Sequence, residues 1–405
     1  MNVMIVGANF DNKGAQSMLF ITIDEIKKRF PQSNVFFAST EIWDKSIYNF
    51  NEVYYSDNAK HIALNKKRFY NQIKCFVKDS IKLIIGRKNL WRSNELSSLC
   101  TSLDLIIDVS GFNLGIKWDV YTHEAYFDNI RLARKYNVPM VLMPQSFGPF
   151  NYDKNKIFLL DEMKELLTYP KIIFAREHEG YKQLKELFNL RNVVLSTDIV
   201  LQNKSVDLNN IYLYYYKKDL PVVSENAVGI IPNQQCFNHG LKEKIFELYK
   251  EILIYLSKLG KKVYIFRHSK SDLAICRELF NMCNNSKNII LLEEELSCFE
   301  YDQFIKRFDF IICSRYHGIV HGYRNFIPAI LLGWSAKYQE LARNVGQEKY
   351  SFDITDFNFS IENVIEAIDD LNHHMKDEAK IIHQQVDKIQ ENNCFSFMFE
   401  NVKIG

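Results

Sequence analysis

Residues 310–338 read FIICSRYHGIVHGYRNFIPAILLGWSAKY, in which two short apolar runs, FIIC and IPAILLG, flank a longer amphipathic segment. Such an alternation is typical of parallel strands connected by helices. The stretch therefore predicts a strand, a helix that starts near Gly318, and a second strand. Polar residues follow the first strand at once, which places Arg315 and His317 at its carboxyl end.

The same alternation runs through most of the chain. Strand-like runs such as VMIVG, NVFFAS, VPMVLMP and KIIFARE occupy the first half, and AVGIIPN, KVYIFRHS and NIILLEEE precede the quoted stretch in the second. With 405 residues the chain is too long for one compact core. We therefore expect an α/β protein of two Rossmann-like, doubly wound domains, 1–200 and 226–405, joined by a linker at 201–225 and facing one cleft.

Composition excludes several classes of protein. The net charge of +2 gives no general case for nucleic-acid binding, and no apolar run approaches the roughly 20 residues that span a bilayer. The cysteines are scattered without a CxxC pair, which favours buried thiols in a reducing cytosol over disulfides or a zinc site. We expect a cytoplasmic globular protein.

The quoted stretch also carries the strongest candidate site. A guanidinium and a helix N-terminus at a strand end together suit a phosphate or carboxylate, and a histidine there can transfer a proton near neutral pH. A lone histidine would more simply cap the helix. With Arg315 two residues from His317, and Lys337 after the next strand, we favour a functional role for all three. His321 lies one helical turn beyond His317, and we interpret it as a supporting residue.

Other strand ends hold further candidates. The segment GANFDNKGAQSM follows the first strand; Asn12 and Gly14 open its helix, where free N–H groups could meet an anion, although a simple turn explains the pattern equally well. Arg176 stands at the end of KIIFAR, Gln145 in MPQSFGP, and His268 in FRHSKSD.

The segment from Lys66 to Arg92 contains nine Lys or Arg residues and one acid, Asp79. Its apolar residues fall at helical spacing: Phe69, Ile73, Phe76, Val77, Ile81 and Ile84. Such a basic amphipathic insertion, about 60–98 with its flanks, can lie on an anionic membrane surface. An ordinary helix with a solvated basic face explains it equally well.

Taken together, these motifs resemble the polysaccharide pyruvyltransferase family over most of the chain. The resemblance rests on NFDNKGAQSM, MPQSFGP, AREHEG and TDIVL, and above all on SRYHGIVHGYRNFIPAILLGWSAKY, where an R-x-H pair precedes a helix, a proline-containing strand and a lysine. The family has a two-domain architecture similar to that of GT-B glycosyltransferases. Its members transfer a pyruvyl unit from phosphoenolpyruvate to two hydroxyls of a sugar and release phosphate.

The resemblance implies Arg176, Arg315 and Lys337 as anion clamps and His317 as proton donor or base, with no metal and no cofactor beyond the donor phosphoenolpyruvate. It also implies a saccharide acceptor, which in this family can be lipid-linked and built at the inner face of the cell membrane. Two alternatives remain. A GT-B glycosyltransferase would need a glutamate late in the second domain for the nucleotide, and none is evident after Gly333. A non-enzymatic scaffold of polysaccharide assembly would leave Arg315, His317 and Lys337 unexplained.

Overall fold

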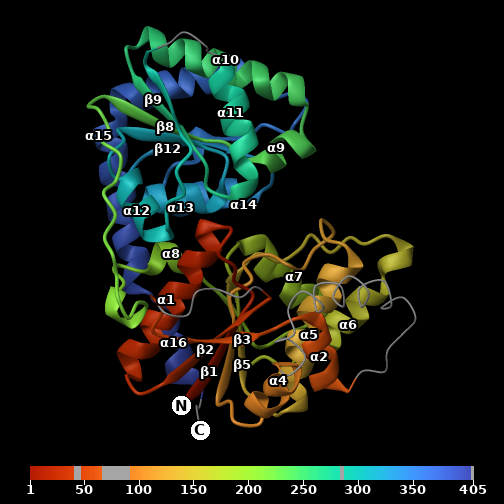
Figure 1. Ribbon diagram of the computed structural model, residues 1–405. Helices are drawn as coiled ribbons and strands as arrows, with labels where there is room; N and C mark the ends of the chain where they lie inside the picture. The colour runs from red at the N-terminus through yellow and green to blue at the C-terminus, as the bar shows by residue number, and fades with distance from the viewer. Residues whose placement is uncertain (41–46, 66–91, 283–286, 403–405) are drawn as a thin grey trace, which may run out of the picture.

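The computed structural model describes residues 1–40, 47–65, 92–282 and 287–402 (Figure 1). Within these ranges the chain forms two parallel sheets with helices on both faces. The seven-stranded first sheet has the order β3-β2-β1-β4-β5-β6-β7, and the six-stranded second sheet has the order β10-β9-β8-β11-β12-β13. The predicted α/β class with two doubly wound units is therefore confirmed.

The first unit comprises these strands: β1 (Asn2–Val6), β2 (Asn34–Ser39), β3 (Asn51–Tyr54), β4 (Leu105–Asp108), β5 (Met140–Gln145), β6 (Ile172–Ala175) and β7 (Val193–Leu195). Its helices are α1 (Lys13–Arg29), α2 (Asp57–Leu64), α4 (Arg92–Cys100), α5 (Val120–Lys135), α6 (Phe158–Leu166), α7 (His178–Phe188) and α8 (Ile199–Gln202). Strands β4, β5 and β6 are buried along their whole length, as expected for parallel strands covered on both faces.

The second unit comprises β8 (Ala227–Ile231), β9 (Lys262–Phe266), β10 (Ile289–Leu292), β11 (Phe310–Cys313), β12 (Ala329–Gly333) and β13 (Ser351–Asp353). Its helices are α9 (Gln234–His239), α10 (Lys242–Lys258), α11 (Leu273–Asn281), α12 (Cys298–Ile305), α13 (Tyr316–Arg324), α14 (Lys337–Asn344) and α15 (Ile361–Glu391), and α16 (Cys394–Asn401) follows. Short 3-10 helices occur at Lys154–Lys156, Leu208–Asn210, Lys270–Asp272 and Glu348–Tyr350.

Each sheet has a point where the direction of strand addition reverses, and this point positions the site. In the first sheet β1 lies between β2 and β4; in the second, β8 lies between β9 and β11. Ligands of open α/β sheets bind at the carboxyl ends of the strands at such a switch point. The two carboxyl edges face each other, since Asn12 beyond β1 forms an antiparallel backbone bridge with Ser269 beyond β9.

The end of the chain returns to the first unit. Figure 1 shows α15 running from the second unit down to the first, where α16 packs. The backbone N–H of Cys394 donates to Gln202 Oε1 at 2.7 Å, and the rings of Phe397 and Phe174 lie 5.9 Å apart. Helix α16 therefore lies on the first sheet, although it falls within the range 226–405 that the sequence analysis assigned to the second domain. Apolar contacts with a distant sheet leave no local mark in a helical pattern.

The first part of the expected linker also packs against the first unit. Ile211 is fully buried, and Tyr48 and Tyr212 form an antiparallel bridge. Tyr214 and Tyr216 beyond it are highly exposed.

Among the helices of the described ranges, none combines the length and apolar character needed to cross a membrane. The predicted basic amphipathic segment, Lys66 to Arg92, lies outside the described residues except for Arg92 at the start of α4.

Candidate active site between the two sheets

His317 lies at the centre of the interface, in the first turn of α13. Its Nε2 atom is 3.2 Å from Oδ2 of Asp198, which caps α8 of the first unit. Burial lowers the pKa of His317, and the neighbouring Asp198 carboxylate partly opposes that shift. The ring is therefore mostly neutral at pH 7 but has a carboxylate at hand to stabilise a proton. That arrangement suits a residue that accepts a proton from one group and then donates it to another.

Gly14 supplies the space for this ring. A Cβ atom on Gly14 would lie 2.1 Å from Cγ of His317, so no side chain fits there while His317 keeps its position. Asn12 caps the same helix, because its side chain accepts a hydrogen bond from the Gly14 N–H at 2.9 Å. The structure thus brings Gly14 to the predicted histidine and gives Asn12 the role of holding the loop.

Arg176, at the end of β6, belongs to the same cluster. Its Nη1 donates to Asp198 Oδ2 at 2.9 Å, and its Nε donates to Glu177 Oε1 at 3.0 Å. Ser146 Oγ accepts from both Nε and Nη2, and the guanidinium carbon lies 4.2 Å from the centre of the Tyr316 ring. The guanidinium of Arg176 is thus held by the buried carboxylates of Asp198 and Glu177. An incoming anion would bind the same guanidinium beside these carboxylates.

Arg315 is the N-cap residue of α13 and is held in a similar way. Its Nε donates to Asp272 Oδ2 at 2.8 Å and its Nη2 donates to the other carboxylate oxygen, which makes a bidentate pair. Nη2 also donates to Ser271 Oγ at 3.1 Å. Arg315 therefore pairs within the second unit, whereas Arg176 pairs with Asp198, the carboxylate that also contacts His317.

Lys337 differs from both arginines. Its Nζ lies 5.1 to 5.8 Å from the ring centres of Phe112, Tyr316, Trp334 and Tyr338, and no carboxylate of the described residues pairs with it. Burial lowers the pKa of Lys337 to about 7. The nearby cations of Arg176, Lys117 and Arg315 add to that shift, and the carboxylate of Glu177 partly opposes it. An ammonium group surrounded by rings and other cations is a ready partner for an anion.

The other two predicted residues lie on either side of this cluster. His268 is fully buried against Tyr301, and neither ring nitrogen has a hydrogen-bond partner among the described residues. Gln145 is directed into the first unit, where its Oε1 accepts from Tyr126 on α5 and its Nε2 faces Asp108. His321 contacts Ser17 Oγ and Asp302 Oδ1 through its two nitrogens, as a supporting residue would.

The most important residue that the sequence analysis did not single out is Asp198. It follows β7 within the motif TDIVL, and the arginine and histidine beside it hold its pKa well below the usual range against the effect of burial. Lys13, between Asn12 and Gly14, is a second; it is buried and lies 3.4 Å from Glu295. An acid between a strand and a helix was the available signal for Asp198. Its partner His317, however, comes from the other unit, more than a hundred residues along the chain.

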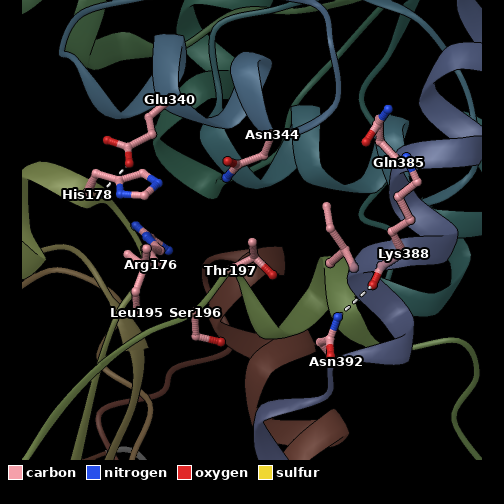
Figure 2. Close-up of a pocket in the computed structure, with 11 residues that line it drawn as sticks. Arg176, His178, Leu195, Ser196, Thr197, Glu340, Asn344, Gln385, Lys388 and Asn392 are labelled. Atoms are coloured by element: carbon pink, nitrogen blue, oxygen red, sulfur yellow. Dashed lines mark hydrogen bonds between the residues drawn. The ribbon is translucent and has the colours of Figure 1, made fainter.

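A polar pocket adjoins this cluster on the side of α15 (Figure 2). Its volume is about 380 Å³, and it is lined by Arg176, His178, Leu195, Ser196, Thr197, Glu340, Asn344, Gln385, Lys388, Ile389 and Asn392. Glu340 of α14 accepts a hydrogen bond from the His178 N–H at the start of α7.

In the part of the chain that the structure describes, no cluster of three or more His, Cys, Asp or Glu side chains could hold a metal ion. A reaction without metal stays a prediction.

The fold is similar to the two-domain GT-B fold of several solved structures. UDP-GlcNAc 2-epimerase from Neisseria meningitidis bound to UDP-GlcNAc aligns with a TM-score of 0.57 at 12% identity, over 99% of each chain. α,α-Trehalose 6-phosphate synthase from Burkholderia multivorans aligns with a TM-score of 0.56 at 8% identity, over 99% of this chain and 97% of that one. A glycosyltransferase from Rickettsia africae gives 0.53 at 13%, over 97% and 93%. At such identities the likeness concerns the fold alone.

The chain belongs to the polysaccharide pyruvyl transferase family, whose model matches residues 12–336. The match includes Gly14, Arg176, Arg315 and His317 and ends one residue before Lys337. It confirms the resemblance drawn from the motifs. No curated protein sequence matches the chain significantly.

Proposed function

We propose that the protein transfers a pyruvyl group from phosphoenolpyruvate to two hydroxyls of a sugar in a polysaccharide or lipid-linked precursor, forming a cyclic ketal. The observation that carries the proposal is the cluster at the facing carboxyl edges of the two sheets, where His317 meets Asp198. The nearby ammonium of Lys337 has no carboxylate partner among the described residues. The second support is that the chain belongs to the polysaccharide pyruvyl transferase family.

The donor fits the charges of this cluster. Phosphoenolpyruvate carries a phosphate and a carboxylate. The cluster offers Lys337, which forms no ion pair with a carboxylate of the described residues, together with Arg176 and Arg315 in paired form. Because both guanidiniums are already oriented by carboxylates, they keep N–H groups in fixed directions for an incoming anion. Lys337 supplies the uncompensated charge.

The proton balance assigns a role to His317. Attack of the first sugar hydroxyl on the central carbon of phosphoenolpyruvate requires that the methylene carbon gain a proton and the hydroxyl lose one. A mostly neutral imidazole beside Asp198 can accept the hydroxyl proton and deliver it to carbon. Phosphate then leaves with its electron pair, and the second hydroxyl closes the ketal and gives its proton to the phosphate.

Thermal unfolding with added ligands tests the proposal. A ligand that binds only the folded protein raises its apparent stability. We expect stabilisation by phosphoenolpyruvate and release of inorganic phosphate when a diol-bearing saccharide is added. Stabilisation by UDP-sugars, with no effect of phosphoenolpyruvate, would favour the glycosyltransferase alternative. The one acid of α14 near the cleft, Glu340, is engaged with the start of α7, which does not favour that alternative.

We further propose that the acceptor is lipid-linked and that the enzyme works at the cytoplasmic face of a membrane. The support is the basic composition of residues 66–92, which suits an anionic surface.

A further inference from the structure

The pocket beside Arg176 holds polar side chains that the protein itself leaves unused. Asn344, Gln385, the Thr197 hydroxyl and the Lys388 ammonium line it, and none of these groups has a hydrogen-bond or ion-pair partner among the described residues. Figure 2 shows the side chains of α14 and α15 on one side and those of Arg176, Ser196 and Thr197 opposite them. Polar groups that converge on a space of about 380 Å³ mark a small-molecule site.

The lining chemistry matches a sugar. Amide and hydroxyl groups both donate and accept hydrogen bonds, as the hydroxyls of a pyranose require. Leu195 and Ile389 add two apolar contacts for the C–H face of a ring. The pocket is open to solvent on the side of Lys388 and Asn392, both exposed, so a longer saccharide could extend from it.

The position of the pocket connects it to the reacting centre. Arg176 forms part of its wall and donates at 2.9 Å to Asp198 Oδ2, the oxygen that lies 3.2 Å from His317 Nε2. Thr197, also in the wall, immediately precedes Asp198 in the chain. One carboxylate thus separates the pocket from the proton-transfer residue.

We propose that this pocket is the acceptor subsite, in which a hexopyranose of the saccharide is held by Asn344 and Gln385 beside the reacting centre. The proposal rests on the pyruvyl transfer proposed above and adds the residues that choose the acceptor.

Leucine substitutions test the subsite, because leucine keeps the approximate size of an amide side chain and removes its hydrogen bonds. The variant is Asn344→Leu with Gln385→Leu, and the control is Gln384→Leu, an exposed neighbour outside the pocket. The probes are methyl β-D-galactopyranoside, methyl β-D-glucopyranoside and methyl β-D-mannopyranoside, which carry the free diol that a ketal needs. Saturation-transfer NMR measures their binding, and thermal unfolding with phosphoenolpyruvate measures donor binding in the same samples.

We expect wild type and Gln384→Leu to bind at least one glycoside, and the double variant to bind it about tenfold more weakly or worse, with donor binding unchanged. Equal glycoside binding by the double variant and wild type refutes the subsite, as does the absence of binding of every glycoside to wild type. If glycoside binding depends on Asn344 and Gln385 but phosphoenolpyruvate neither binds nor reacts, the saccharide site stands and the pyruvyl transfer fails.

Discussion

The pKa of Lys337 makes donor binding dependent on pH in a way that can be calculated. Burial first, and then the neighbouring cations, lower this pKa from 10.5 to about 7. A lysine with a lowered pKa is charged below that value and neutral above it. Since phosphoenolpyruvate is an anion, we expect it to bind most tightly below pH 7 and progressively less tightly above it. With a pKa near 7, about nine tenths of the ammonium groups are charged at pH 6 and about one tenth at pH 8, which predicts a roughly tenfold loss of affinity.

Lys337→Arg isolates this effect, because arginine stays charged at every pH of interest. The dissociation constant of phosphoenolpyruvate is measured by calorimetry from pH 6 to pH 8 in wild type and variant, and the ratio of the two removes the titration of the ligand itself. The matched control is Lys349→Arg, a surface lysine whose pKa is raised by its bonds to Glu378 and Asp370, so that its charge does not change in this range. If wild type and Lys337→Arg show the same pH dependence, Lys337 is not the group that binds the donor.

Three further predictions follow from the cluster and the sequence. His317→Ala and His317→Gln should abolish ketal formation and leave the thermal midpoint close to that of wild type, because Asp198 keeps its ion pair with Arg176 when the ring is lost; near wild-type turnover of either variant across neutral pH would contradict its role. Arg176→Ala should weaken donor binding and also destabilise the fold by about 3–5 kcal/mol, because it leaves Asp198 buried without its arginine, whereas Arg315→Lys should weaken donor binding by loss of the bidentate fork; an unchanged donor affinity in both would remove them from the site. Replacing Lys74, Lys78 and Lys82 with Glu should release the protein from anionic vesicles at low salt without changing turnover of a water-soluble acceptor, and wild-type protein that ignores such vesicles would refute the membrane contact.

Several features of the site follow from local pattern. Apolar runs such as FIIC and KIIFA determine where buried strands end, and the next residues must then lie at the carboxyl edge of a parallel sheet. For this reason Arg176, Arg315, His317 and Lys337 could all be assigned to the cleft before any contact was known. Gln145 obeys the same rule for its backbone, but its side chain points to α5, since alternate residues of a strand face opposite sides of the sheet.

The sequence by itself determined the α/β class, the two units and the strand ends that carry the cations, because strand and helix periodicities are local properties of the chain. Only the tertiary structure decided which charges remain available. Asp198 and Asp272 neutralise the two arginines, whereas Lys337 is in contact with aromatic rings and forms no ion pair with a carboxylate of the described residues. These partners come from separate segments of the chain. The pocket between α14, α15 and the loops after β6 and β7 likewise exists because α15 runs from one unit to the other, a path that no local pattern of residues encodes.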